Sequence, residues 1–299
     1  MKQITILSGK GGVGKSSITA SLAIALSKKR KIVCADCDVD ASNLALVFGM
    51  GTDDFEMWKS ISTNQKARVD LSRCTSCGKC ALECYFDAID WDGAKKIPVF
   101  KEFGCEGCTV CEMICPASAI EMYDVSNARI GYGKTKYGFM VVTGQLEMGE
   151  SGSGKVVSRV KELSLDVSKH ADIMLVDAAA GIGCPVIASV AGSDYVIGVC
   201  EPTPSGFSDL KRALSVVNHF NIPYGIVINK FDLNLEYTRK IEEFAKKKGI
   251  RVLSKLGYDK CFMDALVNLV PVIEFSPAYK EIFDKVVRAL EDEGVFRGK

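Results

Sequence analysis

The sequence has no apolar run that approaches the roughly 18 residues needed to cross a membrane as a helix. It also has no surplus of charge of either sign, because 38 Lys and Arg face 37 Asp and Glu and leave a formal net charge of +1. Its first residues lack the basic, apolar and cleavage regions of a signal peptide. These absences predict a cytoplasmic protein that binds neither membrane nor nucleic acid.

Histidine is scarce, and neither His170 nor His219 has neighbours typical of a catalytic or metal site. Cysteine is abundant instead: eight of the 13 cysteines lie between residues 74 and 115. In a reducing compartment, such clustering indicates metal binding rather than disulfides. With 299 residues, 47% of them hydrophobic, the chain is long enough to form one large domain or two smaller ones with an apolar core.

Strand and helix patterns alternate along most of the chain, beginning with a buried strand at residues 3–8, a glycine-rich turn and a helix. This order predicts an α/β fold, with a mostly parallel sheet and helices on both faces. The alternation stops where the cysteines begin and resumes after them. We therefore expect a discontinuous main domain, residues 1–65 and 125–299, interrupted by a small inserted domain at residues 66–124.

The segment Gly9–Ser16 reads G-K-G-G-V-G-K-S and matches the phosphate-binding pattern G-x-x-x-x-G-K-[ST] between a strand and a helix. In such a loop the glycines expose backbone N–H groups to phosphate oxygens, Lys15 reaches the outer phosphates, and the Ser16 hydroxyl ligates Mg²⁺. The nucleotide-binding residues expected here are Gly11, Gly12, Val13, Gly14, Lys15, Ser16 and Ser17.

The extra lysine at the second position, Lys10, makes this loop resemble the deviant Walker A motif of the MinD/Mrp/nitrogenase-iron-protein class of P-loop ATPases. The resemblance covers nearly all of the chain outside the insert and implies Mg²⁺-dependent ATP hydrolysis. It also implies that Lys10 reaches the partner's nucleotide in a nucleotide-dependent dimer. The partner would be a second copy of the chain or a paralogue.

Two acidic segments resemble the switch regions of this class. Asp36, Asp38 and Asp40 follow the second strand, and the resemblance aligns Asp38 with the carboxylate that positions the attacking water. Asp36 and Asp40 remain alternatives as capping or supporting residues. Asp177 ends an apolar strand in a segment like Walker B and switch II, without the usual proline, and is expected to hold the Mg²⁺ shell.

The identity of the base is open at this stage. Asn229-Lys-Phe-Asp232 spells the N-K-x-D motif with which GTPases read guanine. In the resembled ATPases, an asparagine at this strand end contacts adenine instead, and the loop at Pro202 is similar to theirs. The resemblance therefore favours ATP, with Asn229 and Pro202 near the base, and leaves GTP as the alternative.

Two runs of four cysteines share the spacing C-x₂-C-x₂-C-x₃-C, which is that of bacterial ferredoxins. In that pattern the fourth cysteine of each run belongs to the other cluster. The sequence predicts a small ferredoxin-like α+β domain with two [4Fe–4S] clusters, one on Cys74, Cys77, Cys80 and Cys115, the other on Cys105, Cys108, Cys111 and Cys84. Structural zinc is the alternative, although zinc ribbons use separated C-x₂-C pairs.

Two further cysteines were considered. Cys184 lies seven residues after Asp177, where the nitrogenase iron protein carries a cysteine for its intersubunit cluster. No second cysteine occurs in the best candidate loop, residues 149–155, so a bridging cluster is not expected. We interpret Cys184 as a packed thiol and note Cys37, between two switch aspartates, for testing.

Two classes of function fit these modules. In the first, ATP hydrolysis drives a dimer switch that delivers electrons from the clusters to a redox partner. In the second, the protein is an ATPase of the Mrp/MinD type that carries or assembles iron–sulfur clusters, or positions a protein complex. The sequence favours the first, because four firm thiolate ligands per cluster suit a resident group better than a cargo.

Overall fold

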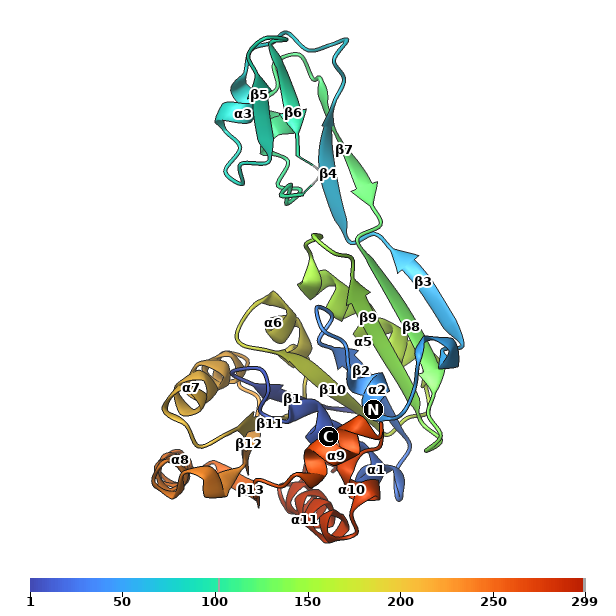
Figure 1. The fold of residues 1–299 in the computed structure, drawn as a ribbon, viewed down its shortest axis with the longest axis vertical. Coiled ribbons are helices and arrows are strands. Elements are labelled where there is room, and N and C mark those ends of the chain that lie inside the picture. Colours follow the sequence, from blue (N-terminus) through green and yellow to red (C-terminus); the bar gives the residue numbers. More distant parts are fainter. Residues whose placement is uncertain (102, 298–299) are drawn as a thin grey trace. The chain divides into compact units, whose positions relative to one another are not determined.

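The protein folds into two compact units, described here in a computed structural model of residues 1–101 and 103–297. The first unit consists of Met1–Trp58, Ile130–Gln145 and Ser153–Lys299. The second unit consists of Lys59–Arg129 and Leu146–Gly152. The chain therefore leaves the first unit twice, and both segments of the second unit are insertions within it (Figure 1).

The second unit is larger than the insert predicted from the sequence. Strands β4 (Asn64–Val69) and β7 (Ile120–Val125) pair antiparallel over their whole length, so the pairing begins before residue 66. The unit also includes Leu146–Gly152, where the Ser151 hydroxyl accepts a hydrogen bond from the Asn64 side chain at 2.7 Å. Nothing in the local sequence pattern of this segment indicates a contact so distant along the chain.

The first unit is built on a mostly parallel sheet with the strand order β13-β12-β11-β1-β10-β2-β9-β8-β3 (Figure 1). Every pair of neighbours from β13 to β9 is parallel, as the alternating pattern predicted. The strands are β1 (Lys2–Ser8), β2 (Ile32–Cys37), β3 (Met57–Ile61), β8 (Ala128–Lys134), β9 (Met140–Leu146), β10 (Ile173–Ala180), β11 (Tyr195–Cys200), β12 (Tyr224–Asn229) and β13 (Arg251–Leu256).

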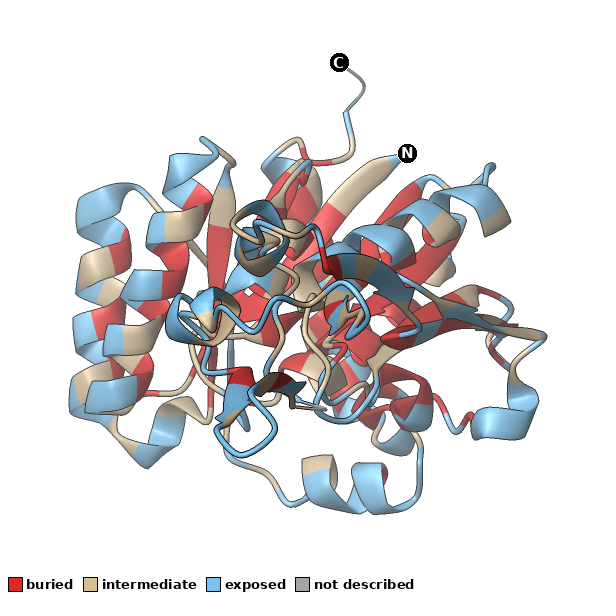
Figure 2. Cartoon of the chain, turned by 90° about the horizontal axis from the view of Figure 1, so that it is seen from above, coloured by how far each residue is buried: buried red, intermediate tan, exposed pale blue. Residues whose placement is uncertain are grey.

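Helices cover both faces of this sheet because alternate side chains of its strands point to opposite sides. Ile4 and Ile6 join one buried apolar cluster, with side chains of α1, α2 and α11, whereas Leu7 joins a second cluster with α6, α7 and α8. Figure 2 shows burial concentrated in the strands, while the outer helix faces are exposed. The helices are α1 (Lys15–Ser27), α2 (Leu44–Val47), α5 (Ser153–Val167), α6 (Cys184–Val190), α7 (Pro204–His219), α8 (Leu235–Lys248), α9 (Cys261–Val267), α10 (Val272–Phe275) and α11 (Ala278–Asp292), with 3₁₀ turns at Thr52–Asp54 and Phe231–Leu233.

The second unit contains two antiparallel strand pairs, of which one is a hairpin, and two single-turn helices. Besides β4 and β7, it has the antiparallel pair β5 (Ile89–Asp92) and β6 (Ile97–Phe100). Each of the helices α3 (Lys79–Leu82) and α4 (Val110–Met113) lies within one cysteine run. Among the described residues of this unit, the buried apolar side chains include Ala67, Ala88, Ile89, Ala119, Ile120 and Ala128.

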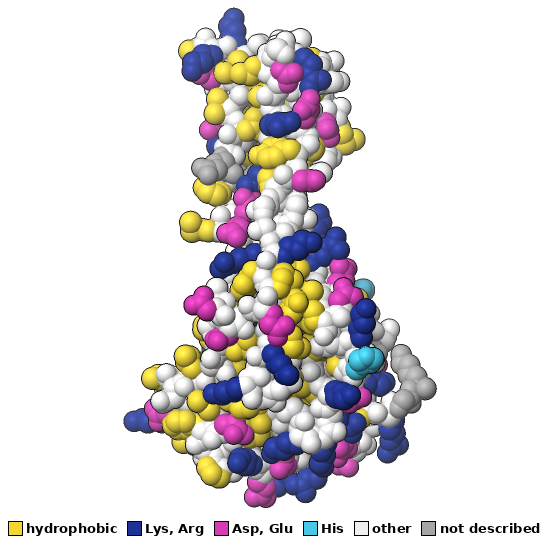
Figure 3. All heavy atoms as spheres, turned by 90° about the vertical axis from the view of Figure 1, so that its right-hand side faces the viewer, with side chains coloured by type: hydrophobic (Ala, Val, Ile, Leu, Met, Phe, Trp, Pro, Cys, Tyr) yellow, Lys and Arg dark blue, Asp and Glu magenta, His cyan; other side chains and the backbone are white. Residues whose placement is uncertain are grey.

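The surface agrees with the charge balance of the sequence. On the face shown in Figure 3, Lys and Arg side chains are interspersed with Asp and Glu. Within residues 1–101 and 103–297, no helix is both long and apolar enough to cross a membrane.

Candidate functional site

The loop between β1 and α1 has a backbone conformation that depends on glycine. Gly12 and Gly14 have φ angles of +77° and +88°, in the left-handed region. A Cβ atom at Gly9 would lie 2.2 Å from the backbone carbon of Asp209, and one at Gly14 would lie 2.5 Å from Nδ2 of Asn229. Larger side chains at these positions would force the loop away from its neighbours, so its compact shape requires glycine.

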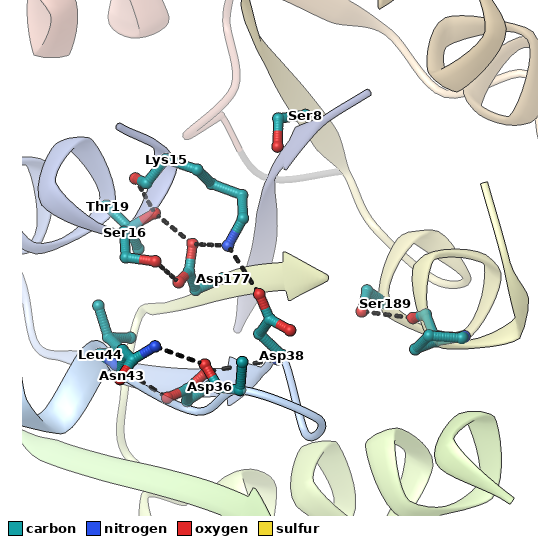
Figure 4. A network of polar contacts seen from close by, with 12 residues as sticks. Ser8, Lys15, Ser16, Thr19, Asp36, Asp38, Asn43, Leu44, Asp177 and Ser189 are labelled. Carbon is teal, nitrogen blue, oxygen red and sulfur yellow. Dashed lines mark hydrogen bonds and ion pairs between the residues drawn. The ribbon is translucent and has the colours of Figure 1, made fainter. Parts of the chain in front are cut away.

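Asp177, near the end of β10, accepts hydrogen bonds from three side chains at the start of α1 (Figure 4). Lys15 Nζ lies 2.8 Å and Thr19 Oγ1 2.9 Å from Oδ1, and the Ser16 hydroxyl donates to Oδ2 at 2.6 Å. The sequence predicted Lys15, Ser16 and Asp177. It missed Thr19, whose only signal is its place one turn after Lys15 on the same helix face.

The charge on Lys15 is maintained although the side chain is only 7% exposed. Burial by itself would lower the pKa of Lys15, but the ion pair and hydrogen bond with Asp177, supported by Asp38 and Asp36, outweigh it and raise the pKa. The Ser16 hydroxyl and the Asp177 carboxylate are adjacent oxygen ligands of the type that Mg²⁺ prefers. The donor set therefore fits one Mg²⁺ ion beside a fixed ammonium group.

The three switch aspartates differ in burial and in the groups that they contact. Asp36 is buried, and its carboxylate accepts hydrogen bonds from the backbone N–H groups of Leu44, at 2.9 Å, and Asp38, at 3.3 Å. Burial, followed by the nearby Asp177 charge, raises the pKa of Asp36 to about 8. These contacts give Asp36 a structural role in folding the segment after β2.

Asp38 is the switch aspartate that approaches the phosphate loop. Its Oδ2 lies 3.9 Å from Lys15 Nζ, and its side chain is 25% exposed (Figure 4). Burial is the main cause that raises its pKa, and Lys15 opposes this shift. Asp40 is exposed. Asp38 is thus the one of the three that is both partly accessible and close to Lys15.

Lys10 makes an ion pair within its own chain. Its Nζ lies 2.6 Å from Oε1 of Glu201, at the end of β11, and Oε2 of Glu201 lies 3.3 Å from Nζ of Lys230. Lys230 Nζ also donates to the carbonyl oxygen of Gly12 at 3.3 Å. In the sequence, Lys230 is recognisable only as part of the N-K-x-D motif and Glu201 has no distinctive signal, because strand order, not local spacing, brings them to the loop.

The N-K-F-D segment also makes contacts within the chain. Asn229 Nδ2 donates to the Val13 carbonyl oxygen at 2.7 Å, and its Oδ1 accepts from the backbone N–H of Lys230 at 3.0 Å. Asp232 Oδ1 accepts from the backbone N–H of Tyr258 at 2.7 Å. Asn229 therefore holds the phosphate loop in place. Pro202, the other residue expected near the base, is buried.

The remaining single cysteines differ in exposure. The interpretation of Cys184 as a packed thiol is wrong, because Cys184 is exposed at the first position of α6. A Cβ atom on Gly154 would lie 3.2 Å from the Cys184 Cβ. Cys37 is fully buried, and burial raises the pKa of its thiol well above the ordinary value. Such a thiol is protonated and unreactive at neutral pH.

The eight clustered cysteines line two cavities in the second unit. Each cavity is lined by three cysteines of one run and the fourth of the other, as the ferredoxin pattern prescribes. One cavity has Cys74, Cys77, Cys80 and Cys115, with Trp91, Pro98 and Ile120. The other has Cys105, Cys108, Cys111 and Cys84, with Phe86, Ile89 and Met122.

The two cavities belong to a structural repeat in which equivalent residues lie 31 positions apart. The backbone N–H of Ala88 donates to Cys84 Sγ at 3.3 Å, and that of Ala119 donates to Cys115 Sγ at 3.2 Å. The left-handed positions also repeat: Ser76 with Gly107, Gly78 with Thr109, and Asp87 with Ser118. The same turns thus present both sets of sulfur atoms, although the repeat is hard to see outside the cysteines.

The four cysteines of each set surround a cavity and do not converge on a single point. Within residues 1–101 and 103–297, no three His, Cys, Asp or Glu side chains converge closely enough to hold a single metal ion. A [4Fe–4S] cubane differs from such an ion because each thiolate binds a separate iron corner. Four cysteines around an apolar cavity are therefore a fitting donor set for a cubane.

A glycine-rich loop opening a helix at the carboxyl edge of a parallel sheet, with a buried lysine and aspartate beside it, defines a P-loop nucleotide-binding protein. The chain belongs to the CobQ/CobB/MinD/ParA nucleotide-binding domain family, whose model matches residues 4–272. In fold it is similar to the septum site-determining protein MinD of Pyrococcus horikoshii, solved with Mg-ADP. That likeness has a TM-score of 0.60 at 18% identity and covers 100% of this chain and 99% of the other.

Two relatives are similar over most of their length. An uncharacterised protein of Methanocaldococcus jannaschii is 40% identical over 80% of this chain and 82% of its own. An iron–sulfur cluster carrier protein of Pyrococcus furiosus is 24% identical over 97% of this chain and 87% of its own. A cytosolic Fe–S cluster assembly factor of Aspergillus oryzae is 35% identical over a shorter stretch, 33% of this chain and 35% of its own.

Proposed function

We propose that the protein is a Mg²⁺-dependent ATPase that carries or assembles iron–sulfur clusters and contains an inserted two-cluster ferredoxin domain. The observation that carries the iron–sulfur part is the pair of cavities, each lined by four cysteines drawn from both runs. Relatives named as a cluster carrier and a cluster assembly factor support the carrier part. These relatives favour this function over the electron transfer that the sequence alone favoured.

The residues around Asp177 account for the proposed hydrolysis. Backbone N–H groups of Gly11–Gly14 would bind phosphate oxygens, and Lys15 would stabilise the charge that develops on the transferred phosphoryl group. Ser16 and Asp177 would hold Mg²⁺. Asp38, partly exposed and close to Lys15, is the carboxylate able to orient an attacking water.

The proposed cycle requires a nucleotide-dependent dimer, with a second copy or a paralogue, in which Lys10 reaches the partner's nucleotide. Family membership supports this arrangement. Lys10 is suited to such a role because its side chain is one-third exposed.

The ferredoxin-like unit would hold two [4Fe–4S] clusters through its cysteines, and the clusters would supply one-electron chemistry when bound. Bound thiolates gain from the N–H groups of Ala88 and Ala119 that already point at Cys84 and Cys115. The apolar residues that line both cavities would limit access of water to the clusters.

Electron transfer to a redox partner is the second candidate. It is favoured by the completeness of the two ligand sets, since four protein thiolates leave no open position from which a cluster is easily passed on. In this version the clusters remain in the protein, and nucleotide changes their reduction potential.

One experiment separates the two candidates. The anaerobically purified protein, with both clusters present, is incubated with an apo-acceptor whose activity needs a [4Fe–4S] cluster, with and without Mg-ATP. Activation of the acceptor with loss of iron from this protein supports the carrier. Retained iron, with a nucleotide-dependent shift of about 40–130 mV in a redox titration followed by EPR, would support electron transfer. Zinc in place of iron would overturn both.

A variant tests the crossed ligand sets. Cys115→Ala should perturb the EPR signal of the same cluster as Cys77→Ala, although the two residues belong to different runs. Cys184→Ala, a cysteine outside both cavities, serves as the control and should leave both signals intact. If Cys115→Ala and Cys108→Ala perturbed the same cluster instead, the assigned ligand sets would be wrong.

A further inference from the structure

Glu201 holds two lysines beside the phosphate loop. Its carboxylate lies 2.6 Å from Lys10 Nζ through Oε1 and 3.3 Å from Lys230 Nζ through Oε2. The Glu201 side chain is 13% exposed, so water screens these pairs less than it screens surface ion pairs. Both lysines are the kind of side chain that would otherwise bind a phosphate anion.

The Glu201 side chain is confined, whereas that of Lys10 can move. The backbone N–H of Thr203 donates to the Glu201 carbonyl oxygen at 2.9 Å. A Cβ atom at Gly206 would lie 2.7 Å from that oxygen and 3.3 Å from Glu201 Cγ, so α7 packs directly against Glu201. Lys10 has a long flexible stem and lies in a loop, so the lysine leaves when the pair breaks.

The position of this carboxylate matters because a nucleotide would bring negative charge to the same place. Lys230 Nζ also contacts the Gly12 carbonyl oxygen, which fixes the Glu201 group next to the loop that binds phosphate. Lys10 Nζ lies 2.6 Å from Glu201, so it can reach a phosphate beyond this contact, such as that of the partner's nucleotide in the proposed dimer, only by moving away from Glu201. Binding of a triphosphate that uses Lys10 must therefore take this lysine from Glu201.

We propose that Glu201 is a positioning residue that competes with the nucleotide's terminal phosphate for Lys10. The proposal rests on the proposed ATPase function. Glu201 retains Lys10 within its own chain until a triphosphate offers more negative charge than the single carboxylate. A diphosphate, which lacks the terminal phosphate, does not release it. The pair thus discriminates triphosphate from diphosphate and delays use of Lys10 in a dimer.

The test uses the full chain with its clusters and compares wild type, Glu201→Gln and Glu236→Gln. Glu236 is the matched control because it is an exposed glutamate. Among the ion pairs of the described residues, its partner is Lys240, one turn along the same helix. Dissociation constants are measured by calorimetry for Mg-ADP and for Mg with a non-hydrolysable ATP analogue. We expect Glu201→Gln to tighten analogue binding about three- to tenfold, the net range of an ordinary intramolecular hydrogen bond, and ADP binding less than twofold. Glu236→Gln should change neither.

A double-mutant cycle shows whether the effect passes through Lys10. In a Lys10→Ala background, Glu201→Gln should no longer change the analogue's affinity. Equal gains in both backgrounds, or an unchanged ratio of the two affinities in Glu201→Gln, would overturn the proposal while leaving the ATPase function intact. Failure of the wild type to bind either nucleotide would instead overturn the ATPase function together with this proposal.

Discussion

The two units of this protein are stabilised in different ways. The first unit buries large side chains, such as Phe48, Phe283 and Leu22, in clusters on both faces of a parallel sheet. The buried apolar groups of the second unit include four alanines, Ala67, Ala88, Ala119 and Ala128, together with Ile89 and Ile120, around cavities lined by cysteine. Burial of an alanine removes much less apolar surface from water than burial of a phenylalanine. The first unit can fold on its own apolar core, whereas we expect the second to need the clusters proposed for it.

The functional groups of the two units also differ, in how far the protein itself holds them together. Lys15, Asp177 and Thr19 already hydrogen-bond to one another in the first unit, so the nucleotide site is organised by the protein itself. The cysteines of the second unit surround cavities, and the proposed clusters would connect them to one another. Metal binding contributes directly to folding in such small units. The predictions below test this contrast, beginning with the largest expected effect.

Removal of iron should unfold the second unit and spare the first. After anaerobic chelation, backbone amides of β4 and β7 should exchange with solvent at least about 100-fold faster, because the ligands that fix both cysteine runs are lost. Amides of β1 and β10 should be unchanged. Hydrogen exchange measured by mass spectrometry follows both pairs of strands in one sample, and equal protection of β4 with and without iron would contradict the contrast.

Lys15→Ala should abolish nucleotide binding and also destabilise the first unit. The substitution leaves the buried Asp177 carboxylate without its cation, which typically costs about 3–5 kcal/mol. Calorimetry should detect no binding of Mg-ATP, and urea should unfold the first unit at a lower concentration. The cluster EPR signals should be those of the wild type. Lys28→Ala is the control, because Lys28 makes only an exposed pair, 3.8 Å from Asp284.

Asp38→Ala should separate binding from hydrolysis. Asp38 lies 3.9 Å from Lys15 and is partly exposed, so its loss should change nucleotide affinity about twofold or less and slow hydrolysis at least about 100-fold. The dimer should then persist in ATP, which sedimentation velocity can detect. Asp40→Ala, at an exposed position, should turn over normally. Equal turnover in Asp38→Ala and wild type would remove the assignment.

The smallest expected effect lies within the repeat of the second unit. Gly78→Ala places a side chain at φ +71° with open space around it, which should destabilise the unit by about 1 kcal/mol. Gly107→Ala has a similar φ of +66°, but the new Cβ would lie 2.5 Å from the Gln65 carbonyl oxygen, so it should destabilise the unit more. Anaerobic calorimetry of the cluster-loaded protein should rank the variants in this order. A reversed order would show that the space around the new Cβ atom does not determine the loss of stability.

Much of the nucleotide site could be predicted because its signals are local. Residues 9–14 form a short loop whose backbone conformation depends on its glycines, and β1 and α1 flank it as the pattern requires. The spacing of each cysteine run likewise predicted which cysteines line a common cavity, since three of them come from one short loop. Thr19 escaped notice because a threonine in a helix carries no distinctive signal.

The contacts that the sequence did not reveal join distant segments. Asn229 and Val13 are 216 residues apart, yet an amide hydrogen bond of 2.7 Å links them. Glu201 meets Lys10 because β11 lies next to β1 in the sheet. The choice among three aspartates also needed burial, which excluded Asp36 as an accessible carboxylate.

The sequence by itself thus determined the nucleotide-binding loop and predicted the proposed iron–sulfur sites, since short loops with fixed spacing present backbone amides and thiols through local backbone geometry alone. Tertiary structure decided which side chains support that chemistry. The order of strands in the sheet brings Glu201, Lys230 and Asn229 to the phosphate loop, and only folding distinguishes the buried Asp36 from the accessible Asp38. The physical reason is that burial and charge pairing depend on distances through space, which spacing along the chain does not specify.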